Sequence, residues 1–132
     1  MRMMTTIRIL AAAGLAALAT VPANAQNLFG TSLAGEELEK AIAEAETHPL
    51  GSLENPIRVN MPAGEYAYLA RLRCEDGSKP SYERRGNVGL GIYQNIIDLY
   101  DVQCEGQEPV EVYMDMYHRR KEDRPVPGFT IK

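Results

Sequence analysis

Asp115 and His118 are the residues whose types and spacing come closest to a reactive pair. The stretch VYMDMYH, 112–118, places a carboxylate three residues before one of only two histidines. Such a pair can serve acid–base chemistry or contribute to a metal site. In a regular strand, however, residues an odd number apart point to opposite faces. Only a bulge, or a strand that ends before His118, would reunite them, so we expect no shared site here.

The other constellations that could carry chemistry are incomplete. A zinc site needs three or four ligands, and two histidines with two mutually bonded cysteines leave too few. The serines lie in cap or turn contexts, and none stands in a G-x-S-x-G motif. The glycines of GNVGLG, 86–91, lack the following helix and Lys-Ser/Thr pair of a phosphate loop. We therefore predict no cofactor, no metal ion and no enzymatic activity.

Asp98 keeps an enzymatic alternative open. It shares a strand face with Cys104, so burial could give its carboxyl group an unusual environment. The alternative is a small hydrolase that uses Asp98 or Asp115 together with His118 in one cleft. The simpler interpretation of Asp98 is a hydrogen-bonded structural acid at the start of a strand.

The N-terminal segment has the features of an export signal. Arg2 and Arg8 precede an uncharged apolar run, and Ala23 and Ala25 form an A-x-A cleavage pattern. We predict a cleaved signal peptide over 1–25 and a single domain over 26–132, located in the periplasm or the extracellular space. The apolar run is too short for a permanent anchor, so no stable membrane insertion is expected after cleavage.

Charge limits the partners. The sequence has 14 basic and 18 acidic residues, a net charge of −4, and loss of Arg2 and Arg8 leaves 12 against 18, or −6. This acidity argues against nucleic acid and against anionic lipid surfaces. The local patches RRGN and HRRK, 84–87 and 118–121, could still contact a single anionic group. The competing interpretation is that these arginines are solvated loop charges.

Cys74 and Cys104 are the only cysteines. Two cysteines in an exported chain, each at the end of a predicted strand, favour a structural disulfide over a reactive thiol pair. The bridge limits the topology, because antiparallel neighbours over 65–74 and 96–104 would hold the cysteines about 30 Å apart. Either the two strands run in the same direction, joined by a crossover over 75–95, or the chain bends near one cysteine, or the bridge is absent. We favour the crossover.

Periodicity predicts an α+β fold. Residues 31–51 form an amphipathic helix, with Leu38, Ala41, Ile42 and Ala45 on one stripe. Strands are expected over NPIRV, 65–74, 96–104 and 110–118, the last two as a hairpin closed by EGQEP. Phe129 and Ile131 should return to the core. The expected architecture is this helix packed on an antiparallel-rich sheet of three to five strands, stapled by the disulfide.

Tyrosines and charges on two predicted strands suggest an interaction surface. Tyr113 and Tyr117 alternate with Glu111 and Asp115, and exposed tyrosines beside charges are typical of interfaces. Arg71 and Arg73 could form ion pairs with the two acids across the sheet. Ordinary strand-forming tyrosines are the competing interpretation. We predict a non-enzymatic domain that binds a protein or other envelope macromolecule; a purely structural envelope protein is a further alternative.

Overall fold

The structure, a computed structural model, describes residues 32–132, so the predicted signal peptide lies outside the described residues. In this range no helix is long and apolar enough to cross a bilayer. The elements in chain order are α1 (Gly35–Ala45), β1 (Ile57–Arg58), α2 (Met61–Arg71), β2 (Leu72–Arg73), β3 (Ser81–Leu90), β4 (Ile96–Gln103), β5 (Val110–Asp115) and β6 (Thr130–Ile131). This α+β content is as the sequence predicts.

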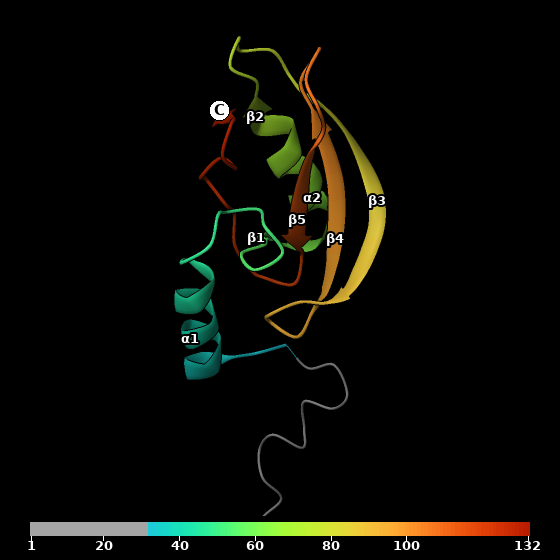
Figure 1. The fold of residues 1–132 in the computed structure, drawn as a ribbon. Helices are drawn as coiled ribbons and strands as arrows, with labels where there is room; N and C mark the ends of the chain where they lie inside the picture. The colour runs from blue at the N-terminus through green and yellow to red at the C-terminus, as the bar shows by residue number, and fades with distance from the viewer. Residues whose placement is uncertain (1–31) are drawn as a thin grey trace, which may run out of the picture.

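The main sheet has four strands in the order β1-β5-β4-β3 (Figure 1). β3 and β5 are each antiparallel to β4, whereas β1 pairs with β5 in parallel. The predicted hairpin of β4 and β5 is confirmed, since Val102 pairs with Val110 next to the connecting turn. β2 and β6 form a separate two-stranded antiparallel pair.

Residues 61–71 form a helix, so the strand predicted over 65–74 is wrong. Pro62 occupies the first turn, where its missing N–H costs no hydrogen bond. The buried side chains of this segment follow a helical period: Glu65, Tyr68, Leu69 and Leu72. The alternation of Tyr66, Tyr68 and Ala70 that suggested a strand is incidental, because Tyr66 is exposed.

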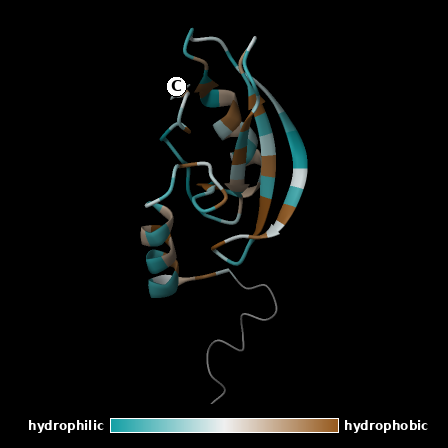
Figure 2. Cartoon of the chain, viewed as in Figure 1, coloured by the Kyte–Doolittle hydropathy of each residue, from teal (hydrophilic) through white to brown (hydrophobic). Residues whose placement is uncertain are grey.

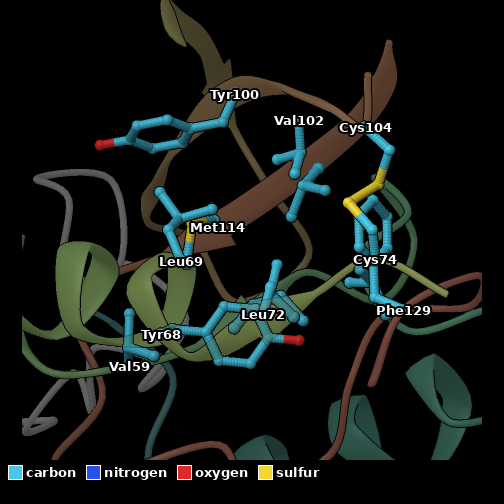
Figure 3. Close-up of a cluster of buried hydrophobic side chains, with 13 residues drawn as sticks. Val59, Tyr68, Leu69, Leu72, Cys74, Tyr100, Val102, Cys104, Met114 and Phe129 are labelled. Atoms are coloured by element: carbon cyan, nitrogen blue, oxygen red, sulfur yellow. A yellow bond between two sulfur atoms is a disulfide. The ribbon is translucent and has the colours of Figure 1, made fainter. Parts of the chain in front are cut away.

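α2, and not α1, is the helix that covers the sheet. Tyr68 and Leu69 belong to the same buried cluster as Tyr100 and Met114 of the sheet (Figure 3). α1 has the predicted position in the sequence, but Ala45 is its only buried residue. Figure 1 shows α1 apart from the sheet, and in Figure 2 it is largely hydrophilic. The predicted placement of the N-terminal helix on the sheet is therefore wrong.

The C-terminal tail closes the core, as predicted. Phe129 is 9% exposed and belongs to the buried cluster, and Ile131 packs against that cluster. Leu72 of β2 pairs with Ile131 of β6, which fixes the tail beside the end of α2. The Arg71 Nε–H group also donates to the backbone oxygen of Lys132.

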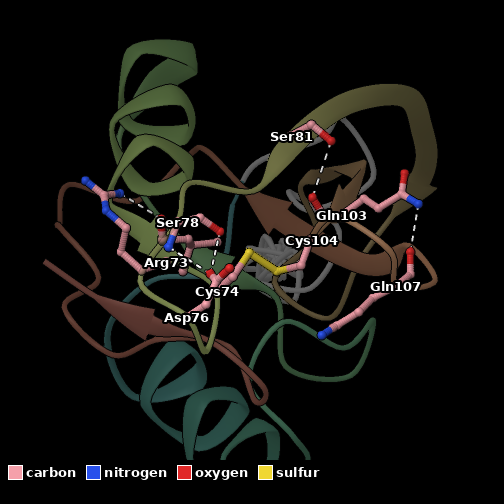
Figure 4. Close-up of a disulfide and its surroundings, with 9 residues drawn as sticks. Arg73, Cys74, Asp76, Ser78, Ser81, Gln103, Cys104 and Gln107 are labelled. Carbon is pink, nitrogen blue, oxygen red and sulfur yellow. Dashed lines mark hydrogen bonds between the residues drawn. A yellow bond between two sulfur atoms is a disulfide. The ribbon is translucent and has the colours of Figure 1, made fainter.

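Cys74 and Cys104 form the predicted disulfide, with 5.9 Å between their Cα atoms (Figure 4). The parallel crossover that we favoured is wrong, because the chain leaves Cys74 through a short loop and returns as β3. Ser81 of β3 pairs with Gln103 of β4, the neighbour of Cys104. An antiparallel partner strand that begins just after Cys74 thus brings the two cysteines together.

β3 is a ten-residue edge strand within the connection that the sequence analysis treated as a crossover. Nine of its ten residues are exposed and Gly86 is partly exposed, so no hydrophobic alternation marks it. The register with β4 shifts between Arg84 and Gly86 and again between Asn87 and Leu90. Gly86, next to the first shift, adopts a φ of 132°, a backbone conformation that residues with a side chain rarely adopt.

Candidate functional site: a basic cleft beside the covering helix

A cleft of about 500 Å³ lies between α2 and the segment that follows β5. It combines an apolar wall with a group of cationic side chains. Its lining residues are Val59, Asn60, Gly64, Ala67, Tyr68, Arg71, Arg119, Arg120, Lys121 and Glu122. This volume lies within the range of small-ligand sites in proteins.

Helical spacing and backbone pairing place the two walls. Gly64, Ala67, Tyr68 and Arg71 recur at three- and four-residue intervals, so they share one side of α2. After β5 the chain stays beside β1, because the His118 N–H group donates to the Val59 carbonyl oxygen at 3.0 Å. The following residues, 119–122, therefore run alongside α2 and form the second wall of the cleft.

The cations of the cleft differ in how far their donors are already used. Arg71 is largely committed, since each of its three guanidinium nitrogens already donates one hydrogen bond, to the backbone oxygens of Lys132 and Glu122 and to Asp123. Arg119 is exposed and, within the described part of the chain, makes no ion pair or side-chain hydrogen bond. Lys121 is 70% exposed and has only a 3.6 Å contact with the equally exposed Asp123. Arg119 and Lys121 are thus free to bind a ligand.

Arg120 is partly committed. Its Nη2 group donates to Glu122 Oε2 at 3.1 Å, but its Nε–H group is buried without an acceptor. A buried donor without a partner is uncommon in folded proteins and carries an energetic cost. The Nε–H group lies below the surface of the cleft, so only the terminal nitrogens of the partly exposed Arg120 are left for a ligand.

The acid of the cleft, Glu122, is held by arginines. Burial acts to raise the pKa of Glu122, but the hydrogen bonds from Arg124 and the charge of Arg120 outweigh it and keep the pKa below the usual range. Arg124 also binds Glu46 at the end of α1 with two contacts of 2.9 Å. Glu122 is therefore an anion that fixes the loop, and it is not available as a general acid.

A buried cation next to the cleft strengthens the positive potential. Arg58 is 6% exposed and has a single 3.7 Å ion-pair contact, with Glu46, among the described residues. Its guanidinium lies 5.9 Å from the centre of the Tyr93 ring. Burial, and then the charge of Arg120, lower the pKa of Arg58. The positive charges of Arg58 and Arg120 are thus close enough to repel each other.

Asp115 and His118 come together, contrary to our expectation. β5 ends at Asp115, so the alternation of faces does not extend to His118, and the Asp115 Oδ2–His118 Nε2 distance is 3.2 Å. His118 Nε2 has no hydrogen-bond partner among the described residues, so this is a close contact and not a hydrogen bond. Asp115 accepts hydrogen bonds from the Asn95 amide and the Tyr117 N–H. The pair is buried, with Asp115 at 0% and His118 at 9% exposure.

Asp98 is a paired acid and not a partner of His118. Arg84 of β3 donates to its carboxylate at 2.8 Å, and Asp98 lies on the α2 side of the sheet opposite Met114. Asp115 is the residue after Met114 and therefore points to the other side. The structure thus brings Asp115 to His118 and keeps Asp98 apart from them.

Glu65, which the sequence analysis did not single out, is a buried acid under α2. Its Oε2 atom accepts a hydrogen bond from the Tyr100 hydroxyl at 2.9 Å, while Oε1 has no partner. Burial raises the pKa of Glu65 to about 7; the Tyr100 hydrogen bond opposes this shift and the charge of Asp98 adds to it. Near neutral pH, the buried Glu65 carboxyl group is therefore protonated in part of the molecules and ionised in the rest.

The shift at Glu65 predicts a loss of stability as the pH rises. Between pH 4.5 and about 7 the folded state keeps a proton that the unfolded state has released, so unfolding becomes easier over this window, by about 3 kcal/mol in total. Glu65→Gln should remove that fall and be more stable than the parent at pH 8. Urea unfolding from pH 4 to pH 8 measures both, with the exposed Glu105→Gln as a control. Parallel profiles for parent and Glu65→Gln would contradict the assignment.

The six residues of the predicted interaction surface do not form one patch. Arg71 and Arg73 lie at the end of α2 and in β2, where Arg73 donates to the carbonyl oxygens of Ala70 and Leu72. The ion pairs expected with Glu111 and Asp115 are absent among the described residues, because the arginines are not on a neighbouring strand. Asp115 is buried, and Tyr117 is 45% exposed. Glu111 and Tyr113 do lie together, with a 3.1 Å hydrogen bond.

The fold and the site define a disulfide-linked α+β domain with a cationic cleft. Comparison of the chain with protein-family models, with curated proteins and with solved structures finds no match.

Proposed function

We propose that this chain is an exported, non-enzymatic binding domain of the cell envelope or the extracellular space, and that it binds another macromolecule through the cleft beside α2. The observation that carries the proposal is the contrast in charge. The whole sequence has a net charge of −4, yet three cations with unused donors, Arg119, Arg120 and Lys121, gather at one cleft.

The state of the reactive groups supports a binding role over a catalytic one. A general base needs a path to its substrate, and both Asp115 and His118 are buried. Both oxygens of Asp115 already accept hydrogen bonds. No cluster of three metal-ligating side chains occurs between residues 32 and 132. The hydrolase alternative, built on Asp98 or Asp115 with His118, thus depends on buried side chains, none of which lines the cleft beside α2.

The disulfide supports the exported location. Bridges of this kind form and persist in oxidising compartments such as the periplasm and the extracellular space. Cys74 and Cys104 are both buried, at 4% and 7% exposure, which is typical of a structural disulfide. The apolar N-terminal run of the sequence points to the same destination.

Filling the cleft should abolish partner binding without affecting the fold. Ala67 is exposed on the cleft side of α2, so an indole at this position occupies the cleft and leaves the core intact. We expect Ala67→Trp to lose the complex that chemical cross-linking traps with the parent protein in the exporting cell. Ala70→Trp, equally exposed on α2 but outside the cleft, is the matched control.

The outcome is decided by comparing the two tryptophan variants. Equal melting temperatures for both, with the cross-linked complex missing only for Ala67→Trp, would support the cleft as the binding site. If both variants retain the complex, the partner binds elsewhere, and the proposal for the cleft fails.

A further inference from the structure

We infer that the cleft binds the free carboxyl end of a polypeptide whose last side chain is apolar. This inference rests on the proposed function, since it names the group that the binding site recognises. It follows from the donors at the cleft, from its apolar wall and from the charge of the rest of the chain.

The donors call for an anionic oxygen group. Arg119 and Lys121 have no strong partner within residues 32–132, and the side chain of the partly exposed Arg120 makes a single hydrogen bond, to Glu122. Arginine presents its donors as a planar fork that matches the two oxygens of a carboxylate, and such charge-assisted bonds are among the stronger ones. One carboxylate can satisfy two of these three side chains at once.

The opposite wall calls for an apolar group beside that anion. Val59, Gly64, Ala67 and Tyr68 carry no charge. Gly64 and Ala67 are the accessible ones, and the buried Val59 and Tyr68 pack behind them. A Cβ at Gly64 would lie 3.2 Å from Val59 Cβ, so glycine at this position lets α2 lie close to Val59. The terminal residue of a peptide offers both an anion and an adjacent side chain.

The charge of the whole chain favours a polypeptide over a lipid surface or a nucleic acid. A membrane rich in anionic lipid, or a phosphate backbone, would meet the acidic remainder of this protein as well as the cleft. A single α-carboxylate places one negative charge at the cleft, while the body of its partner can be neutral or basic. The exposed acids of α1, Glu36, Glu37, Glu39 and Glu44, fit such a partner.

A paired peptide library tests the inference on the intact protein. The probes are hexapeptides with an N-terminal fluorophore, randomised at the last two positions, made once with a free carboxyl end and once as the C-terminal amide. We expect enrichment of free-acid peptides that end in an apolar residue, and at least about tenfold weaker binding of the corresponding amides in fluorescence anisotropy.

Two double variants assign the effect to the cleft. Arg119→Ala with Lys121→Ala should weaken binding of the free-acid peptides about tenfold or more, and leave the amides almost unchanged. Lys40→Ala with Lys79→Ala removes the same charge from exposed sites elsewhere and should retain full binding. This control separates a specific contact from a general change in net charge.

Several results would overturn the inference. If free-acid and amide peptides bind equally well, or if no peptide is enriched, the cleft does not recognise a C-terminal carboxylate. Loss of the cellular complex in Ala67→Trp would in that case still support the cleft as the binding site of the partner. Binding to vesicles with anionic phospholipid that depends on Arg119 and Lys121, without peptide binding, would assign the cleft to a lipid headgroup. If peptides bind but Ala67→Trp keeps its cellular partner, the proposed function fails and the peptide site stands.

Discussion

Replacing Met114 by aspartate should leave no cooperatively folded domain. Met114 is 0% exposed, pairs with Ile57 of β1 and Asp98 of β4, and lies in the cluster beneath α2. The substitution removes a buried apolar side chain, at a cost of about 2 to 5 kcal/mol, and adds an unpaired charge beside Asp98. Together these costs approach or exceed the whole stability of a domain of this size, about 5 to 15 kcal/mol.

Two further variants give this prediction its controls. Met114→Leu conserves the volume and should cost less than about 1.5 kcal/mol. Tyr113→Ala, next in the chain but on the other face of β5, should cost little, because its hydroxyl contacts only the exposed Glu111. Circular dichroism and urea unfolding measure all three. A folded Met114→Asp variant with an unfolded Tyr113→Ala variant would show that the faces of β5 are assigned the wrong way round.

Loss of the disulfide should cost about 3 to 4 kcal/mol. The bridge closes a loop with a sequence separation of 30, and in the chain-entropy model a loop of this length constrains the unfolded state by that amount. The double variant Cys74→Ala with Cys104→Ala, and the parent protein under reducing conditions, should both unfold at correspondingly lower urea concentrations. The parent without reductant is the reference for both.

A thiol assay completes the test of the disulfide. Both cysteines are buried, so alkylation of the native protein alone would not distinguish a bridge from protected thiols. Denatured protein should show no free thiol until a reductant is added. Free thiols in the unreduced sample, or a stability loss below about 1 kcal/mol, would contradict a structural role.

The features that the sequence predicted correctly are those that depend on the pattern or type of a few residues. The hairpin of β4 and β5 was predictable, because alternating residues flank a short turn and one face is buried, with Val102 and Val112 at 0% exposure. The disulfide was predictable as well, since the N-terminal segment predicts export and a pair of cysteines in an exported chain usually forms a bridge. The return of Phe129 and Ile131 to the core followed from their apolar character in a polar tail.

The two helices show why periodicity alone can mislead. Residues 65–72 satisfy a period of two and a helical period at the same time, and only the burial of Leu69 next to Tyr68 distinguishes them. The usable signal was Pro62, which suits the first turn of a helix. The strong amphipathic pattern of α1 could not reveal which surface its apolar stripe would meet, because that depends on the position of α2.

The cleft could not be predicted because its walls are distant in sequence. Gly64 and Ala67 belong to a helix that the sequence analysis interpreted as a strand, and Arg119 and Lys121 follow β5. The one available signal was the HRRK patch, which we considered as a contact for a single anionic group. β3 was missed for a different reason: an edge strand exposed on both faces has no hydrophobic pattern to recognise.

The disulfide changes what a proteolytic cut can do to this molecule. All of β3 and β4 lies between Cys74 and Cys104, and β3 presents Arg84 and Arg85 on an exposed edge strand. Trypsin that cleaves after Arg85 would break the backbone but leave both pieces covalently joined and β4 in its register between β3 and β5. The nicked protein would migrate as one chain on a gel until it is reduced. The bridge thus keeps the two pieces of the β3–β4 pair together after the chain itself has been cut.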